Sequence, residues 1–309
     1  MNDIWSKYVQ GAKTLYYSRK LRFDDMFAEQ YKTLFGLDEN KNLKILEIGC
    51  GPGALAGALH RWYPNAGIVA VDRDSEFIRF AREHEEGIMF SEGDITALSL
   101  EDGSFDVVIS NTVCEHIEPS RFYGEQYRIL KPGGICLVLS SRKGITILPD
   151  CVTPSEKEQL FWKRVQQYDD TFDRYAIHKY PMNEAELPRA MEQHGFRNIQ
   201  TGFVAVDLTP DNPKFSSDLV HNMIDADRYS DIEAIDSVLY SIPEHFTGEE
   251  IREMKDLANA KYDARIAEYD RGERQWDTSV SIIMVVRGVR QVSLETVYHN
   301  GSTPIIYSS

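Results

Sequence analysis

The sequence has few of the features that mark zinc-binding, disulfide-rich or membrane-spanning proteins. Among its 309 residues no C-x-x-C pair occurs, so neither a metal site nor a disulfide framework is indicated. The four cysteines stand far apart, at Cys50, Cys114, Cys136 and Cys151. We therefore expect reduced thiols and a cytoplasmic protein, because disulfides persist mainly in oxidising compartments. The longest apolar runs, ICLVL at 135–139 and IIMVV at 282–286, are far shorter than the ~20 residues of a membrane span.

Positive charge is also scarce. Lysine and arginine total 34 against 49 aspartates and glutamates, a formal net charge of −15. A chain this acidic repels phosphate backbones, so we expect neither nucleic acid nor an anionic membrane as a partner. The densest basic cluster, Arg19-Lys20 with Arg22, is short. The composition, 42% hydrophobic and 27% charged, is that of a globular protein.

Short apolar segments and amphipathic segments alternate in the first half of the chain. Strands are predicted at 44–48, 68–71, 88–90, 105–110 and 135–140. Helices are predicted between them, at 54–63, 75–85 and 121–130. This alternation predicts an α/β fold, a parallel sheet with helices on both faces. Ligands of such sheets bind at the carboxyl ends of the strands, which right-handed connections bring to one edge.

The rhythm breaks after residue 144, where proline-rich, helical and strongly acidic segments follow. We divide the chain into an N-terminal helical lid at 1–36, a cofactor-binding core at 37–144, a cap insertion at 145–182, a core helix and strand at 183–209, an acidic helical insertion at 210–278, a last core strand at 279–290 and a tail at 291–309. The acidic insertion is a solvated helical face, a dimer interface or a selector of cationic acceptors. A homodimer is therefore one expected partner state.

A glycine loop follows the first strand. Glu47-Ile48-Gly49-Cys50-Gly51-Pro52-Gly53-Ala54 supplies backbone that can turn with positive φ and approach a ligand closely, next to the positive end of a helix. Gly49, Gly51 and Ala54 also satisfy the dinucleotide fingerprint G-x-G-x-x-G/A. Two kinds of adenosine cofactor, a nicotinamide dinucleotide and a sulfonium nucleoside, therefore compete at this point.

Three acidic residues end three successive predicted strands. Glu47 precedes the loop, where a carboxylate suits a cationic ligand and suits a pyrophosphate badly. Asp72 ends the second strand and can accept both hydroxyls of an adenosine ribose. Asp94, in EGDI, can accept from an adenine amine. The alternative for Asp72 and for Asp94 is a carboxylate that only caps a turn.

Five ordered segments resemble one family. ILEIGCGPG, VAVDRD, EGDI, FDVVISNTVCEHI and LKPGG, spread over about residues 43–143, are similar to the motifs of class I S-adenosylmethionine-dependent methyltransferases, and within them to the methyltransferase type 11 group. The resemblance implies S-adenosyl-L-methionine as cofactor. It also implies a Rossmann-like, doubly wound, seven-stranded sheet with a reversed last strand, which SIIMVVRG at 281–288 fits. The helical cap insertions and the N-terminal leader depart from the simplest pattern of the family.

The resemblance assigns roles to residues of the core. Gly49, Cys50 and Gly51 would pass under the methionine part of the cofactor, with Glu47 nearby. Asp72 would bind the ribose hydroxyls with Arg73 beside it. Asp94 and Ile95 would hold the adenine. Asn111 would lie beside the sulfonium.

Catalytic and lid residues are less constrained by the sequence. Methyl transfer depends mainly on alignment and on exclusion of water, and a base is needed only for a poor nucleophile. His116 is the candidate base, and its alternative role is to cap or pack a helix start. Tyr17 and Arg22 are candidates to close the cofactor pocket, since arginine can pair with a carboxylate; the alternative is a surface helix with an aromatic stripe. FDRYAIHKYP at 172–181 either lines the acceptor site or packs on the sheet.

Three functions remain open from the sequence. The first is methyl transfer from S-adenosylmethionine to a small-molecule acceptor. The second is a NAD(P)-dependent oxidoreductase that uses the same glycine loop. The third is a non-catalytic module that binds the cofactor.

Overall fold

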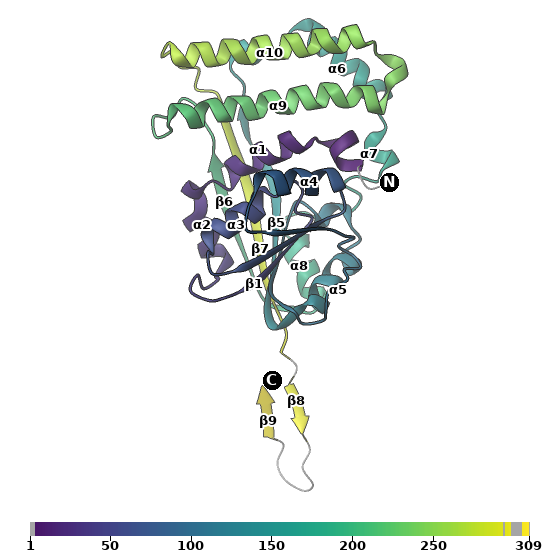
Figure 1. Ribbon diagram of the computed structural model, residues 1–309, viewed down its shortest axis with the longest axis vertical. Helices are drawn as coiled ribbons and strands as arrows, with labels where there is room; N and C mark the ends of the chain where they lie inside the picture. Colours follow the sequence, from purple (N-terminus) through teal and green to yellow (C-terminus); the bar gives the residue numbers. More distant parts are fainter. Residues whose placement is uncertain (1–3, 293, 298–304, 309) are drawn as a thin grey trace.

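A single mixed sheet forms the centre of the protein. The computed structural model describes residues 4–292, 294–297 and 305–308 (Figure 1). The sheet has seven strands in the order β3-β2-β1-β4-β5-β7-β6. The strands are β1 Lys44–Ile48, β2 Gly67–Asp72, β3 Met89–Glu92, β4 Phe105–Asn111, β5 Leu130–Ile147, β6 Phe196–Asp207 and β7 Thr278–Arg290. In the part of the chain so described, no helix combines the length and the apolar character that crossing a membrane requires.

The direction of the strands confirms the predicted fold class. Strands β3, β2, β1, β4 and β5 run parallel to one another. Strand β7 is antiparallel to both of its neighbours, β5 and β6, so the predicted reversed last strand is present. The order of the strands changes direction at β1, between β2 and β4. A crevice at that point is where open parallel sheets bind their ligands.

Helices cover both faces of the sheet, as the alternation predicts. They are α3 Ala54–Trp62 and α4 Ser75–His84 on one face and α5 Pro119–Ile129 and α8 Glu186–Gln193 on the other. Side chains alternate along each strand, so Val107 and Ile109 join the first core while Val108 joins the second. This alternation follows from the two-residue period of a strand. Because both faces are buried, the strands read as continuous apolar runs.

The leader is helical and packs against the first face. It comprises η1 Trp5–Val9, α1 Ala12–Arg22, η2 Asp25–Phe27 and α2 Ala28–Phe35. Tyr31 and Phe35 of α2 are fully buried in the core beside Trp62, and the rings of Tyr31 and Trp62 stack at 5.4 Å. Tyr31 and Phe35 of the leader therefore form part of the core, whereas Trp5, Tyr8 and Tyr17 are only half-buried.

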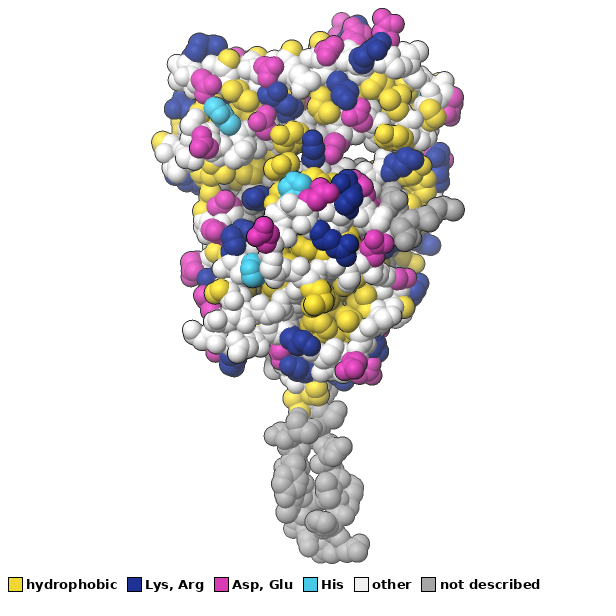
Figure 2. Space-filling view, viewed as in Figure 1, with side chains coloured by type: hydrophobic (Ala, Val, Ile, Leu, Met, Phe, Trp, Pro, Cys, Tyr) yellow, Lys and Arg dark blue, Asp and Glu magenta, His cyan; other side chains and the backbone are white. Residues whose placement is uncertain are grey.

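A third layer of helices lies beyond α1 (Figure 1). Its elements are η4 Asp150–Val152, α6 Glu156–Tyr168, α7 Thr171–Arg174, α9 Ser217–Ser241, η5 Pro243–His245 and α10 Gly248–Asp270. Helices α6, α9 and α10 share a small core of their own, which includes Phe161, Ile235 and Met254. Acidic and basic side chains are interspersed over this layer (Figure 2). The functional division into lid, core and insertions stays a prediction.

Two strands connect the sheet with this outer layer. Strand β5 continues past residue 144, the predicted end of the core, because Ile145 and Ile147 pair with Val280 and Thr278 at the start of β7. Beyond β7, β8 Leu294–Val297 and β9 Ile305–Ser308 form a separate antiparallel pair within the predicted tail. The rest of that tail, at 293, 298–304 and 309, lies outside the described residues.

A buried ion cluster fixes the outer layer to β7. The Arg265 side chain on α10 is 1% exposed, and its Nη2 lies 3.1 Å from Asp211 and 2.6 Å from Asp277. Asp211 is itself fully buried and accepts from the backbone amides of Gln275 and Trp276. A buried carboxylate whose cation is removed keeps the cost of desolvation and loses the attraction that offsets it.

We expect Arg265→Leu to lower the free energy of unfolding by about 3–5 kcal/mol, because it removes the buried cation shared by Asp211 and Asp277 and leaves Asp211 only the half-exposed Arg274, 3.4 Å away. Urea unfolding followed by circular dichroism measures the change. Arg271→Leu is the matched control, since Arg271 forms an exposed pair with Glu273 and such pairs contribute about 1 kcal/mol or less. Equal effects of the two variants would contradict this account.

Candidate functional site

The glycine loop forms the floor of the candidate site. After β1, Gly49 and Gly51 adopt positive φ values of 67° and 53°, which side-chain-bearing residues rarely adopt. A Cβ on Gly49 would lie 2.5 Å from the Val113 Cγ2 atom. The amide of Gly51 donates to the Asp72 Oδ2 atom at 2.8 Å. The loop therefore presents bare backbone to the carboxyl edge of the sheet and is tied there to β2.

A cavity of about 370 Å³ lies above this loop, at the carboxyl ends of β1 to β4. Its volume is within the range of small-molecule sites. Seven of the residues predicted from the sequence line it: Gly49, Gly51, Asp72, Arg73, Asp94, Ile95 and His116. The structure thus brings together residues from four strand-end loops and from η3 Cys114–His116.

The two aspartates of this cavity are held by backbone amides. Asp72 accepts from Gly51 and, through Oδ1, from the Asp74 amide at 2.9 Å. Burial raises the pKa of Asp72, although these two hydrogen bonds oppose the rise. Burial also raises the pKa of Asp94, but bonds from the amide and hydroxyl of Thr96 outweigh it and hold that pKa below its ordinary value. Each carboxylate retains lone pairs that can accept from a ligand.

Glu47 lies beneath the loop and is almost completely buried, at 1% exposure. Its Oε2 atom has no hydrogen-bond partner. Burial raises its pKa to about 8, against the attraction of Arg19 and with the repulsion of Asp72. A buried carboxyl oxygen without a partner costs free energy, and a cation or donor placed nearby would offset that cost.

Five predicted residues do not line this cavity: Glu47, Cys50, Asn111, Tyr17 and Arg22. Cys50 and Asn111 are buried, at 2% and 4% exposure, so only their backbone can take part in binding. Tyr17 and Arg22 line a neighbouring, larger cavity. The lid residue that reaches the cofactor cavity is Arg19, which the sequence analysis named only as part of a basic cluster.

Arg19 joins the leader to the sheet edge. Its Nη2 donates to the Thr112 hydroxyl at 2.8 Å, and its Nη1 would lie 3.2 Å from a Cβ placed on Gly51. Burial, together with repulsion from Arg22, lowers the pKa of Arg19 to about 10. Leu15, Arg19 and Arg22 are spaced i, i+4 and i+7, which is one helix face. That spacing is the signal that could have identified Arg19.

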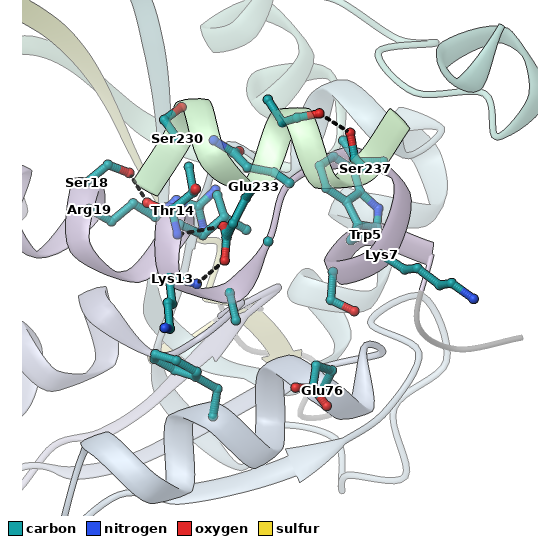
Figure 3. A pocket seen from close by; sticks show the side chains of 18 of the residues that line it. Trp5, Lys7, Lys13, Thr14, Ser18, Arg19, Glu76, Ser230, Glu233 and Ser237 are labelled. Carbon is teal, nitrogen blue, oxygen red and sulfur yellow. Dashed lines mark hydrogen bonds between the residues drawn. The ribbon is translucent and has the colours of Figure 1, made fainter. Parts of the chain in front are cut away.

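The larger cavity, of about 910 Å³, lies between η1, α1, α4 and α9 (Figure 3). Glu233 of α9 closes one side by accepting from the amides of Lys13 and Thr14 at 3.2 and 2.9 Å, as the dashed lines show. A carboxylate at the first turn of a helix stabilises that helix end. Trp5, Arg19, Thr112 and His116 line both cavities, so the two are adjacent.

His116 stands between the two cavities. Its Nδ1 accepts from the backbone amide of His178 at 3.1 Å, and its ring contacts the Trp5 ring edge-on at 4.6 Å. Burial and the charges of His178, Arg73 and Arg19 lower its pKa to about 3. The ring is therefore neutral at physiological pH and carries its proton on Nε2, 4.0 Å from the Glu115 Oε1 atom. That separation is too long for a hydrogen bond, and the low pKa leaves His116 little basicity.

The segment 172–181 covers this part of the site. Phe172 and His178 line the larger cavity, while Tyr175 and Tyr180 line the smaller one. The Tyr180 amide donates to the backbone carbonyl of Glu115 at 2.8 Å. The position of segment 172–181 therefore favours the expectation that it lines a site over the alternative that it only packs on the sheet.

Glu115, His116 and His178 also bring ligand-type atoms within 4.8 Å of one another. Metal binding requires an unprotonated ring nitrogen. In His116 one nitrogen accepts a backbone proton and the other holds the proton of the neutral ring. Both nitrogens of the His116 ring are thus occupied in this arrangement, and we assign no metal to the group.

A comparison with known families identifies the core. Residues 46–138 match the family model described as a methyltransferase domain. The matched segment begins within β1 and contains the glycine loop, β2 to β4 and most of the residues that line the 370 Å³ cavity. The resemblance stated for the motifs of this segment is thereby confirmed.

Several characterised or catalogued proteins share this segment. A malonyl-[acyl-carrier protein] O-methyltransferase of Pectobacterium atrosepticum is 34% identical over 36% of this chain and 46% of its own length. A fatty-acid O-methyltransferase of Mycolicibacterium smegmatis is 35% identical over 32% of this chain and 37% of its own. An uncharacterised 37.1 kDa protein of a Streptomyces fradiae transposon is 34% identical over 35% and 33%. The chain thus spans between a third and half of the length of these relatives.

Among solved structures, a Haemonchus contortus phosphoethanolamine N-methyltransferase in complex with S-adenosyl-L-methionine has a TM-score of 0.49 and 17% identity. The superposition covers 94% of this chain and 60% of the other. A Streptomyces coelicolor geranyl diphosphate C-methyltransferase has a TM-score of 0.45 and 15% identity, with coverage of 87% and 77%.

The environment of His116 generates a prediction on pH. The unfolded chain takes up a proton at His116 near its ordinary pKa of 6.5, whereas the folded protein resists it down to about 3. Stability is therefore lost as the pH falls below 6.5. We expect His116→Gln to remove about 1 kcal/mol of the stability difference between pH 7.5 and pH 5.5. Urea unfolding at both pH values measures this, and an identical pH dependence in the variant and the parent protein would contradict it.

Proposed function

Residues 46–138 belong to the methyltransferase domain family, and we propose that the whole chain is an S-adenosylmethionine-dependent methyltransferase that acts on a small-molecule acceptor. Relatives named for malonyl-[acyl-carrier protein] and for fatty acids share the same domain. Their acceptors differ, so the domain supports the cofactor and the reaction class, while the remainder of the chain would select the acceptor.

The observation that carries the proposal is that the buried Glu47 Oε2 atom has no hydrogen-bond partner. It lies buried under a loop of left-handed glycines, where a cationic nucleoside can approach the backbone. A dinucleotide would place its pyrophosphate over the same loop, against a carboxyl group. The residues present therefore fit S-adenosylmethionine and oppose the oxidoreductase alternative.

Each side of the cofactor has a candidate residue. Asp72 would accept the ribose hydroxyls, with Arg73 beside it, and Asp94 with Ile95 would hold the adenine. Gly49 and Gly51 would pass under the methionine part, together with the backbone of Cys50 and Asn111. Arg19 would pair with the cofactor carboxylate, because it is the lid arginine that lines this cavity.

When bound, S-adenosylmethionine supplies an electrophilic methyl carbon. The chain would align the acceptor with this carbon and exclude water, and these two effects account for much of the acceleration in such a transfer. Trp5 and Thr112, which line both cavities, would keep the acceptor aligned at the boundary. His116 stays a candidate catalytic residue, although its lowered pKa makes it a weak base.

The cellular setting is part of the same proposal. The four cysteines are free thiols, which supports a cytoplasmic location. A homodimer through the acidic helical layer remains a prediction that sedimentation can test.

The cofactor site can be tested at Asp72. Asp72→Asn should weaken binding of S-adenosylhomocysteine by about 1–3 kcal/mol, because it removes charge-assisted hydrogen bonds, and titration calorimetry measures the loss. Asp102→Asn is the control, since Asp102 is exposed and paired with Arg128. Binding of NAD in place of S-adenosylhomocysteine would reject the proposed function.

Glu47 generates a second test. With its pKa raised to about 8, Glu47 is mostly protonated at pH 7, and a cationic ligand that lowers this pKa must release a proton. We expect S-adenosylmethionine to bind with proton release at pH 7 and to bind more tightly as the pH rises toward 8. Calorimetry in buffers of different ionisation enthalpy measures the protons released. Glu47→Gln should abolish the release, and a release that persists in this variant would assign it to another group.

A further inference from the structure

We propose that the acceptor carries a carboxylate group and that Arg22 binds it in the larger cavity. The proposal rests on the proposed function, since it names the class of acceptor for that site. It also moves Arg22 from the cofactor, where the sequence placed it, to the acceptor.

The first observation is that Arg22 lacks a partner. Within the described residues its guanidinium makes no hydrogen bond and no ion pair within 4.0 Å. The other half-buried arginines of that part of the chain each have such a contact: Arg19, Arg128, Arg142, Arg164, Arg228, Arg287 and Arg290. A half-buried guanidinium that lines a cavity and has no ion pair within 4.0 Å has donors available for an anionic ligand.

The second observation is the position of Arg22. Arg22 lines the larger cavity and also a third cavity, of about 340 Å³. Ser18 and Ser230 line the same two cavities. Ser230 and Ser141 face the larger cavity with hydroxyls that make no hydrogen bond among the described residues. Figure 3 shows Ser230 above α1 on the side where Ser18 and Arg19 lie. A guanidinium with free hydroxyls nearby is a donor set for a carboxylate.

The charge of the surroundings favours one negative charge over two. Burial lowers the pKa of both Arg19 and Arg22, and repulsion from Arg22 lowers that of Arg19 further, so an anion between the leader and the sheet would stabilise two cations. Asp227 attracts Arg22 from the far side, and burial with repulsion from Asp231 and Asp277 raises its own pKa to about 6. Since Glu115 also lines the larger cavity, a phosphate dianion would be repelled more strongly than a carboxylate. The Trp5 and Phe172 rings offer apolar walls for the rest of the molecule.

The test uses the full chain saturated with S-adenosylhomocysteine. Octanoate and phenylacetate are the probes, 1-octanol and phenylacetamide are their neutral counterparts, and phenyl phosphate is the dianionic one. Calorimetry should show binding of at least one carboxylate, at least tenfold tighter than its neutral counterpart and than phenyl phosphate. Arg22→Gln should weaken that binding at least tenfold, while Arg22→Lys should retain part of it.

Controls separate this inference from the proposed function. Arg61→Gln removes an exposed ion pair with Asp25 and should leave carboxylate binding unchanged. Arg22→Gln should bind S-adenosylhomocysteine within twofold of the parent protein, and Arg22→Lys serves if the glutamine variant does not fold. The inference would be overturned if no carboxylate bound, or if phenyl phosphate or the neutral probes bound more tightly. It would also be overturned if the Arg22 variants bound the carboxylate as tightly as the parent protein, or if they lost much of their affinity for S-adenosylhomocysteine. Failure of the parent protein to bind S-adenosylhomocysteine would instead reject the proposed function.

Discussion

The parallel pairing of β1 with β2 and β4 is the constraint on which the site depends. Parallel strands joined by right-handed helical connections place their carboxyl ends along one edge. The loops after these strands therefore meet, although Gly49, Asp72, Asp94 and Thr112 are well separated in the sequence. The Gly51–Asp72 hydrogen bond joins the first two of these loops directly. Without that register, the carboxylates would not face a common cavity.

The features that sequence could predict are those determined locally. Alternating apolar and amphipathic segments indicate strands and helices through their periods, and glycines next to a strand end indicate a turn with positive φ at Gly49 and Gly51. The aspartates at strand ends follow from the same topology. These residues line the cavity because each is placed by its own strand.

The features that sequence could not predict depend on contacts between distant elements. The choice between Arg19 and Arg22 depends on how α1 lies over the sheet, which is set by Glu233 of α9 and by Thr112. The environment of His116 is made by Trp5 and His178, which are both far from it in the sequence. No sequence period or spacing near His116 indicates these two contacts. The sequence therefore could not show whether His116 acts as a base.

The long strands β5 and β7 have a consequence for the way the protein is divided. They are hydrogen-bonded to each other from Ile135 with Val289 to Ile147 with Thr278, from the middle of the sheet to the outer helices. The acidic helices are thus an extension of two central strands and not a detachable module. Helices α9 and α10 follow β6, which ends at Asp207, and precede β7, which begins at Thr278, so the outer layer is held to the sheet at both of its ends.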